Sequence, residues 1–267
     1  MPTMEYTREV TLPSKGIFYE DAIPGGVLTI QSWSTKDQKL LAGSESIGDD
    51  MTNRLLKSGV MTEGVDLDKL LLTDRMFLLF HIRALSYGDL YRFSWKCSQC
   101  GTQVADEMDL RTDVGINWVE DGSSADEPAW EEPYDYAFRS GTTISLRYLR
   151  YSDQKAISAY TKTAFKNQKQ KDGDPTYFYR IARRIVNIDG EKAKDIRTTM
   201  EWLASLRGPD SVDLLEALEY HEHGLELKLE RPCSKCGWEE AMVLPFGSDF
   251  FHPGSGIIRK SRDADLG

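Results

Sequence analysis

Two copies of one short cysteine motif constrain this chain more than any other feature of its sequence. The segment KCSQCG contains Cys97 and Cys100, and PCSKCG contains Cys233 and Cys236. Both the cysteines and the glycines around them recur at a constant offset of 136 positions: Gly88, Cys97, Cys100 and Gly101 correspond to Gly224, Cys233, Cys236 and Gly237. This shared register predicts an internal duplication.

The four cysteines have the spacing of a zinc site. Zinc prefers four tetrahedral ligands, and two thiolates two residues apart on a tight turn supply half of that set. One CxxC pair alone also fits a redox pair at the start of a helix. Here alternating residues precede both pairs, and strand-like or irregular chain follows them. We therefore expect one structural Zn²⁺, with reduced turns that bind no metal, or a disulfide, as the alternatives. The expected ligands are Cys97, Cys100, Cys233 and Cys236.

Similarity between the two halves continues upstream of the cysteines. Residues 27–44 resemble residues 143–160, and Asp37 in the first DQK block lies 116 positions before Asp153 in the second. The offset is smaller by about twenty residues, so the second copy has an insertion, which we place at 166–175 and 187–194. Each aspartate is expected near the start of a helix, where the positive end of the helix dipole stabilises it.

Each copy predicts the same order of elements. A strand (28–33 or 144–149) leads to a helix that starts at Ser34 or Ser152. A buried helix follows, capped by Thr73 or Asp74 in the first copy and by Asp210 or Ser211 in the second, and it stops at glycine. Alternating residues then predict a strand that ends at the cysteine pair. These residues are Tyr91, Phe93 and Trp95 in one copy and Leu225, Leu227 and Leu229 in the other.

The sequence therefore predicts an α+β fold. It would have two related α+β lobes from an internal duplication, joined through a four-cysteine zinc ribbon made of two β-hairpin knuckles. The predicted divisions are 1–112 for the first copy, 113–136 for an acidic linker, 137–246 for the second copy and 247–267 for a C-terminal tail. We expect Trp118 and Trp130 to dock the linker on this chain's own surface rather than on a partner. Phe250, Phe251, Ile257 and Ile258 in the tail need a surface to cover, on this chain or on a neighbour.

Charge and composition narrow the functional classes. A net charge of −10 disfavours nucleic acid as a partner. The segment Lys162–Lys171 is the nearest thing to a basic cluster, and we expect a solvated face there, with an acidic partner as the alternative. No run is long and apolar enough to cross a membrane, and the first residues lack the apolar core of a secretion signal, so we expect a cytoplasmic protein.

No residue pattern in the chain is typical of an enzyme active site. There is no phosphate-binding glycine loop, no nucleophile elbow and no histidine pair spaced for catalytic zinc. His81 is expected as a hydrogen-bonded core residue. His221 and His223 are expected to cap the end of a helix, and His252 lies in the irregular tail. We expect a protein without enzymatic activity.

One family resemblance follows from these motifs. The order STKDQKLLAGS, then DLDKLLLTDRMFLLFHIRALSYG, a strand and KCSQCG resembles the baseplate hub protein family of contractile-tailed, T-even-like bacteriophages, best over 28–110 and extending through Leu244. The resemblance implies a subunit of the virion tail baseplate, made in the host cytoplasm, with Cys97, Cys100, Cys233 and Cys236 as zinc-ribbon ligands. It implies hub or wedge subunits as partners and several copies in a symmetric assembly. The alternatives are an assembly chaperone that leaves the baseplate hub, a nucleic-acid-binding zinc-ribbon protein, and an enzyme with an unrecognised site.

Overall fold

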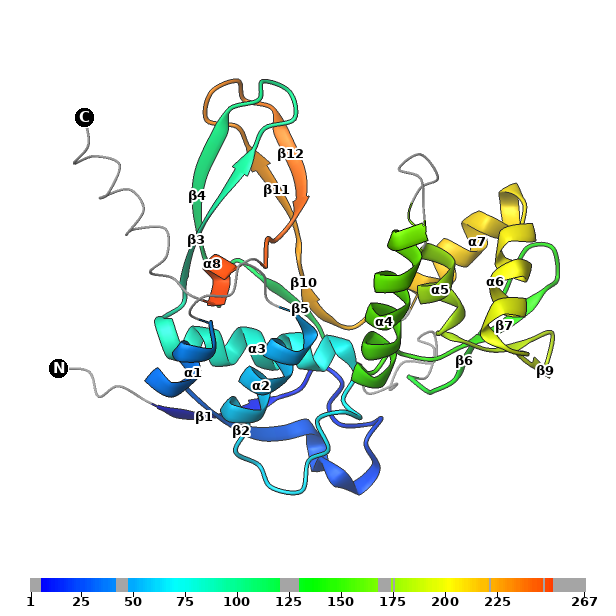
Figure 1. Cartoon of the computed structure of the whole chain (residues 1–267), viewed down its shortest axis with the longest axis horizontal. Coiled ribbons are helices and arrows are strands. Elements are labelled where there is room, and N and C mark those ends of the chain that lie inside the picture. Colours follow the sequence, from blue (N-terminus) through cyan, green and yellow to red (C-terminus); the bar gives the residue numbers. More distant parts are fainter. Residues whose placement is uncertain are drawn as a thin grey trace.

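The computed structural model describes residues 6–41, 48–120, 130–167, 174, 176–220, 222–246 and 248–251. Helices and small antiparallel sheets form two lobes, so the predicted α+β class is confirmed. Two long β-hairpins stand together above the first lobe, and the second lobe lies to one side (Figure 1).

The first lobe is built around one long buried helix. The hairpin strands β1 and β2 pair antiparallel, and three helices follow them. The elements are β1 (Thr7–Thr11), η1 (Glu20–Ala22), η2 (Pro24–Gly26), β2 (Val27–Gln31), α1 (Thr35–Leu41), α2 (Asp49–Gly59) and α3 (Leu72–Tyr87). Helix α3 is apolar on most of its surface and therefore forms the centre of the lobe, with Phe77, Leu78 and Ile82 all buried.

The predicted cap of α3 is wrong by two to three residues. The helix begins at Leu72, and its N-cap residue is Leu71, which makes no side-chain cap. Asp74 is instead fully buried, accepting hydrogen bonds from the Tyr19 hydroxyl and, at 3.2 Å, from the Ser14 backbone N–H. A short polar residue near a helix start is indistinguishable from a cap in sequence when its partners lie about sixty residues away. The helix ends at Gly88, as predicted, where φ is +87°.

The second lobe is a four-stranded antiparallel sheet covered by helices. Its strand order is β6-β7-β8-β9. The strands are β6 (Tyr134–Ala137), β7 (Thr143–Leu146), β8 (Ile185–Ile188) and β9 (Glu191–Lys192). The helices are α4 (Tyr151–Asn167), α5 (Tyr177–Ala182), α6 (Ile196–Ser205) and α7 (Gly208–Glu219). The predicted caps of α7 at Asp210 or Ser211 are wrong, because Pro209 lies in its first turn and the helix begins earlier. The predicted stop at Gly224 is also wrong, since α7 ends at Glu219.

The predicted helix starts at the two DQK blocks are confirmed. Both the backbone N–H and the hydroxyl of Ser34 donate to Asp37, at 2.8 and 2.6 Å. The backbone N–H of Arg150 donates to Asp153 at 2.9 Å. In each case an aspartate in the first turn reaches back to a free backbone N–H at the start of the helix.

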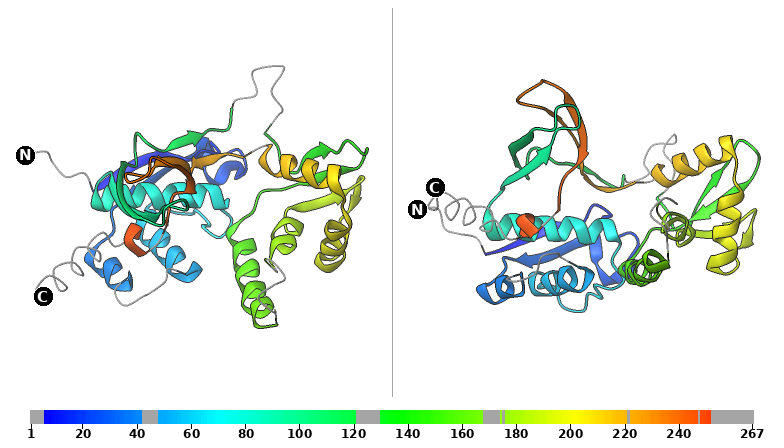
Figure 2. Two further views of the ribbon diagram at one scale, coloured as in Figure 1. Left: turned by 90° about the horizontal axis from the view of Figure 1, so that it is seen from above. Right: turned by 45° about the horizontal axis from the view of Figure 1, so that its top comes forward.

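Two paired hairpins and a short strand pair complete the molecule. The elements are β3 (Leu90–Lys96), β4 (Gln103–Asp109), β5 (Gly115–Asn117), β10 (Gly224–Glu226), β11 (Lys228–Pro232), β12 (Glu239–Val243) and α8 (Ser248–Phe251). Strand β5 pairs antiparallel with β10. The chain therefore leaves the first lobe at β5, builds the second lobe and returns beside the point of departure (Figures 1 and 2).

The segments predicted as linker and tail contact this chain. Val119 is buried and its N–H donates to the Pro13 carbonyl at 2.9 Å, and the Trp130 ring meets the His223 ring edge-on. In α8, Phe250 and Phe251 are buried, and Arg83 donates to the Phe250 carbonyl at 3.2 Å. Residues 121–129 of the linker, Ile257 and Ile258, and most of 166–175 lie outside the described residues. The division of the sequence at 112, 136 and 246 stays a prediction about the two copies. In the folded chain, β10, β11, β12 and α8 pack with the first lobe.

Candidate metal centre

The four predicted cysteines lie together at the tips of the two hairpins. Their sulfur atoms are all within 4.8 Å of one another. The Cys97 and Cys236 sulfurs are 3.8 Å apart, and those of Cys100 and Cys233 are 3.7 Å apart. Four sulfurs at about 2.3 Å from a zinc ion lie about 3.8 Å from one another in a tetrahedron. Two sulfur pairs across the turns therefore lie at the separation that a tetrahedral zinc site needs.

The two turns have the same backbone construction. In the first turn, the Cys97 N–H donates to the Thr102 carbonyl at 2.9 Å, and the Gly101 N–H donates to the Cys97 carbonyl at 2.9 Å. In the second turn, the Cys233 N–H donates to the Trp238 carbonyl at 2.8 Å, and the Gly237 N–H donates to the Cys233 carbonyl at 2.9 Å. Both glycines adopt positive φ, +69° and +72°, which other residues adopt only at a cost.

The strands that lead into the two turns both alternate as predicted. Strand β3 alternates as predicted, with Tyr91, Phe93 and Trp95 buried. The predicted second strand also alternates, but it is divided into β10 and β11, because Leu225 pairs with β5 and Leu229 pairs with β12.

Polar contacts between the hairpins fix one turn against the other. The N–H and hydroxyl of Ser98 donate to Glu240 of β12 at 2.9 and 2.7 Å. Arg231 of β11 lies 3.7 Å from Asp106 of β4. These contacts lie beside the sulfurs and hold the two CxxC turns in one orientation.

The thiols lie in different electrostatic surroundings. Hydrogen bonds to the side chain and backbone of Thr102 lower the pKa of Cys100 to about 6. At Cys236, the hydrogen bond with the Trp238 N–H lowers the pKa. Desolvation and the three neighbouring sulfurs outweigh it and raise the pKa to about 12. Four neighbouring thiols without a cation resist complete ionisation, and a divalent cation removes that resistance.

The donor set fits a structural ion and not a catalytic one. Cys97 and Cys233 are buried, and Cys100 and Cys236 reach the surface. Four thiolates would complete a tetrahedral shell and leave no position for water or substrate. Within the described part of the chain, these cysteines form the one group of three or more such ligands that converge.

The family model described as T4 bacteriophage base plate protein matches residues 3–252. The chain belongs to this family. No curated protein and no solved structure gives a match. The resemblance to phage baseplate proteins is thereby confirmed, and the chain is a structural protein of a T4-like tail baseplate that associates with other tail proteins.

Two histidines of this baseplate protein differ from their predicted roles. His223 is buried and does not cap a helix, since its Nε2 atom lies 2.9 Å from the Thr73 hydroxyl of α3. His81 is half-buried and its Nε2 has no hydrogen-bond partner among the described residues. Burial lowers the pKa of His81 to about 4, so the ring is neutral at pH 7. His221 and His252 lie outside the described residues.

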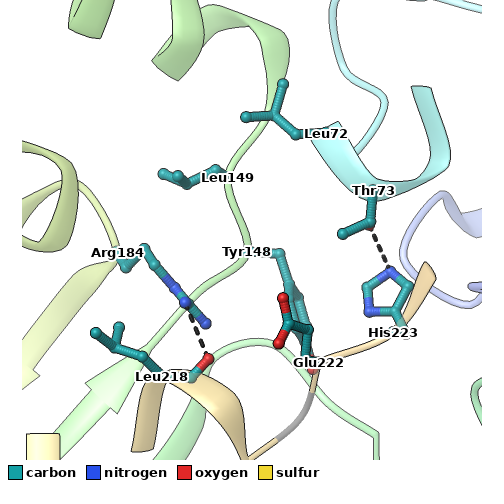
Figure 3. Close-up of a pocket in the computed structure, with 8 residues that line it drawn as sticks. All are labelled: Leu72, Thr73, Tyr148, Leu149, Arg184, Leu218, Glu222 and His223. Carbon is teal, nitrogen blue, oxygen red and sulfur yellow. Dashed lines mark hydrogen bonds between the residues drawn. The ribbon is translucent and has the colours of Figure 1, made fainter. Parts of the chain in front are cut away.

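The contact between His223 and Thr73 lies at the joint between the lobes. A small cavity of about 140 Å³ opens there, with Arg184 donating to the Leu218 carbonyl at 3.1 Å on its opposite wall (Figure 3). Its lining residues come from both lobes: Leu72, Thr73, Tyr148, Leu149, Arg184, Leu218, Glu222 and His223. The sequence motifs did not predict this joint, because its contacts come from residues outside the repeated glycine and cysteine motif.

Among the described residues, no helix has the length and apolarity to span a bilayer.

Proposed function

We propose that this baseplate protein is a subunit of the tail hub and that it acts by binding neighbouring hub or wedge subunits. Membership of the baseplate family supports a structural role. The projecting ribbon and the two lobes offer several places for protein contacts (Figure 1). On this proposal the chain has no enzymatic activity, is made in the host cytoplasm and stays in the virion tail baseplate in several copies.

The proposal includes one structural Zn²⁺ on Cys97, Cys100, Cys233 and Cys236. The single observation that supports it best is the sulfur separation of 3.7 and 3.8 Å between the two turns. The identical hydrogen bonding of both turns supports it further. Zinc would fasten the β11–β12 hairpin to the β3–β4 hairpin and so close the loop of chain that contains the second lobe.

The proposal also includes an internal duplication. Each half contains a β-hairpin, a helix that starts at a DQK block, further helices and a hairpin tipped by CxxC. The positive-φ glycines Gly101 and Gly237 occupy the same place in both turns. The copies would extend over 1–112 and 137–246, with the acidic segment 113–136 between them and a tail over 247–267.

Quantitative mass spectrometry of purified tail particles tests the hub role. We expect this polypeptide in every particle, at a copy number that matches the symmetry of the hub. Absence from mature particles, with presence in hub precursors, would instead assign it to the chaperone-like assembly role. The chain's absence from both would contradict any direct part in the hub.

A further inference from the structure

One helical hairpin of the second lobe has a charge opposite to that of the whole chain. Between Arg147 and Arg184 the sequence contains ten lysines and arginines and three aspartates, a net charge of +7, within a chain of net charge −10. This segment contains α4 and α5. The rest of the chain is therefore strongly acidic, and basic and acidic surfaces lie on one molecule.

The C-terminal part of α4 projects from the lobe. Its last buried residue is Ile157, and none of the residues 158–165 is buried. It contacts α5 through Tyr160, whose ring stacks on Tyr179 with centroids 4.1 Å apart. Phe165 remains 56% exposed and Tyr177 45% exposed. A helix end that buries so little of its own surface presents aromatic rings to solvent.

Four of the positive charges of this segment already have acidic partners. Arg147 and Arg183 pair with Asp153, Arg150 pairs with Glu132, and Lys155 pairs with Asp68. Lys162, by contrast, is exposed and makes no ion pair with any described residue. Together with Phe165, which lies one turn further along α4, it forms a surface with positive charge and an exposed ring, which we call the basic α4–α5 surface.

Helix α7 presents the complementary chemistry. Val212 and Leu215 on its outer face are 47% and 50% exposed, and Tyr220 just after the helix is 50% exposed. Glu216 and Glu219 lie between them on the same face at helical spacing and are exposed. This acidic α7 surface therefore combines apolar side chains with carboxylates.

The two surfaces cannot meet within one molecule. In the left view of Figure 2, α7 lies along one side of the second lobe and the free end of α4 lies at the opposite side. A surface and its complement on opposite sides of one chain make a head-to-tail contact between copies, which closes into a ring or extends as a filament. We propose that the basic α4–α5 surface of one copy binds the acidic α7 surface of a second copy.

This contact deepens the proposed function, because it supplies a means for several copies to assemble in the hub. It is tested on the purified chain alone, so its failure would leave the baseplate role standing. Sedimentation velocity of the full chain at low and high salt measures it. We expect self-association that weakens at least tenfold as salt rises, since charge complementarity contributes to the contact.

Charge reversal on each surface gives a sharper test. Lys162→Glu and Glu216→Lys should each weaken self-association at least tenfold, and mixing the two variants should restore it, since reversed and native surfaces then pair in alternation. Lys36→Glu, at an exposed position on α1 in the other lobe, makes the same charge change and should leave association intact. Circular dichroism confirms that each variant is folded.

Three results would overturn the proposal. These are a monomer under all conditions, association that neither reversal weakens, and a mixture that does not recover. A single-stranded oligonucleotide provides the competing outcome: if it binds, if Lys162→Glu abolishes that binding, and if the chain does not self-associate, the basic α4–α5 surface binds nucleic acid instead.

Discussion

The backbone of one CxxC turn positions each cysteine sulfur, and that sulfur contacts a sulfur of the other turn. Across the two hairpins, the Cys97 sulfur lies 3.8 Å from that of Cys236, and the Cys100 sulfur lies 3.7 Å from that of Cys233. Loss of one ligand therefore affects both turns, because the remaining three sulfurs still repel one another when ionised.

Replacement of one ligand tests this dependence. Cys100→Ser should remove the bound metal, from one ion per chain to well below one, and lower the thermal midpoint of the ribbon, because metal binding contributes folding free energy. Metal analysis after gel filtration measures the first effect. Ser234→Ala, in the second turn but outside the ligand set, is the control and should keep its metal. Full metal retention in Cys100→Ser would contradict the assigned ligand set.

The glycines after each cysteine pair give a second test. Gly101→Ala should destabilise the ribbon by about 1–2 kcal/mol, because φ of +69° is strained for a residue with a Cβ. No neighbouring atom obstructs the added Cβ closely, so the cost arises from the backbone. Chemical denaturation measures it. Gly208→Ala at the start of α7, where φ is not positive, should cost nothing or stabilise slightly. Equal effects at both positions would contradict the backbone explanation.

At the same scale, the sequence predicts the clustering of the four cysteines better than it predicts buried polar partners. Spacing alone indicated that cluster, because a CxxC turn is local geometry and the second CxxC turn supplies its complement. Asp74 and His223 were misinterpreted, because their partners, Tyr19 and Thr73, come from distant positions. No local pattern distinguishes a capping group from a polar group that binds across the core.

At the scale of single elements, the two DQK helix starts have the same cap and different burial. Asp37 serves the start of α1 at the surface. Asp153 is 1% exposed and also accepts ion pairs from Arg147, at 2.6 Å, and from Arg183, at 2.5 Å. The same motif is thus a cap in one lobe and a buried junction of charges in the other.

Asp153→Asn should therefore destabilise the protein by about 3–5 kcal/mol, since it leaves two arginines without their carboxylate. Burial tends to raise the pKa of Asp153, but hydrogen bonds from Arg147, Arg150 and Arg183 lower it overall. Because the folded pKa is the lower one, the carboxylate stabilises the fold above its ordinary pKa, near 4, and this stabilisation is lost as the pH falls through the folded pKa.

Chemical denaturation at pH 7 and at pH 3 measures both effects of Asp153→Asn. The native protein should lose stability towards pH 3, and the variant should lose less. Asp37→Asn is the matched control from the first lobe and should cost at most about 1 kcal/mol, since it loses only a surface cap. Similar losses in the two variants would show that burial of Asp153 contributes little.

Element order was largely predictable and element pairing was not. The repeated motif predicted both CxxC hairpins and the helices before them, because hydrophobic period and turn motifs are local. The pairing of β5 with β10 joins strands more than one hundred residues apart, and both are only three residues long. Strands this short have too little alternation to be recognised, so the return of the chain to the first lobe was missed.

At the scale of the whole molecule, the ribbon closes a loop of chain and does not lie between the lobes. Both hairpins stand over the first lobe (Figure 1). Tyr91 of β3 donates to the Pro245 carbonyl at 2.8 Å, and α8 packs beside it. Chelation has two conceivable effects, unfolding of the ribbon or loosening of the lobes, and this packing favours the first.

Hydrogen exchange with and without a chelator tests this. Removal of metal should increase exchange in β3, β4, β11 and β12, because the hairpins lose the ion that fastens their tips. Helices α6 and α7 in the second lobe should keep their protection and serve as the internal control. Increased exchange across the second lobe as well would mean that the metal fixes the lobes to each other.

The central claim is that one metal ion holds the four sulfurs of two turns. Elemental analysis of the native protein, combined with alkylation of its thiols, tests it most directly. We predict one zinc ion per chain and four thiols that resist alkylation until a chelator is added. A protein without bound metal, whose four thiols are alkylated at once in the folded state, would contradict the account.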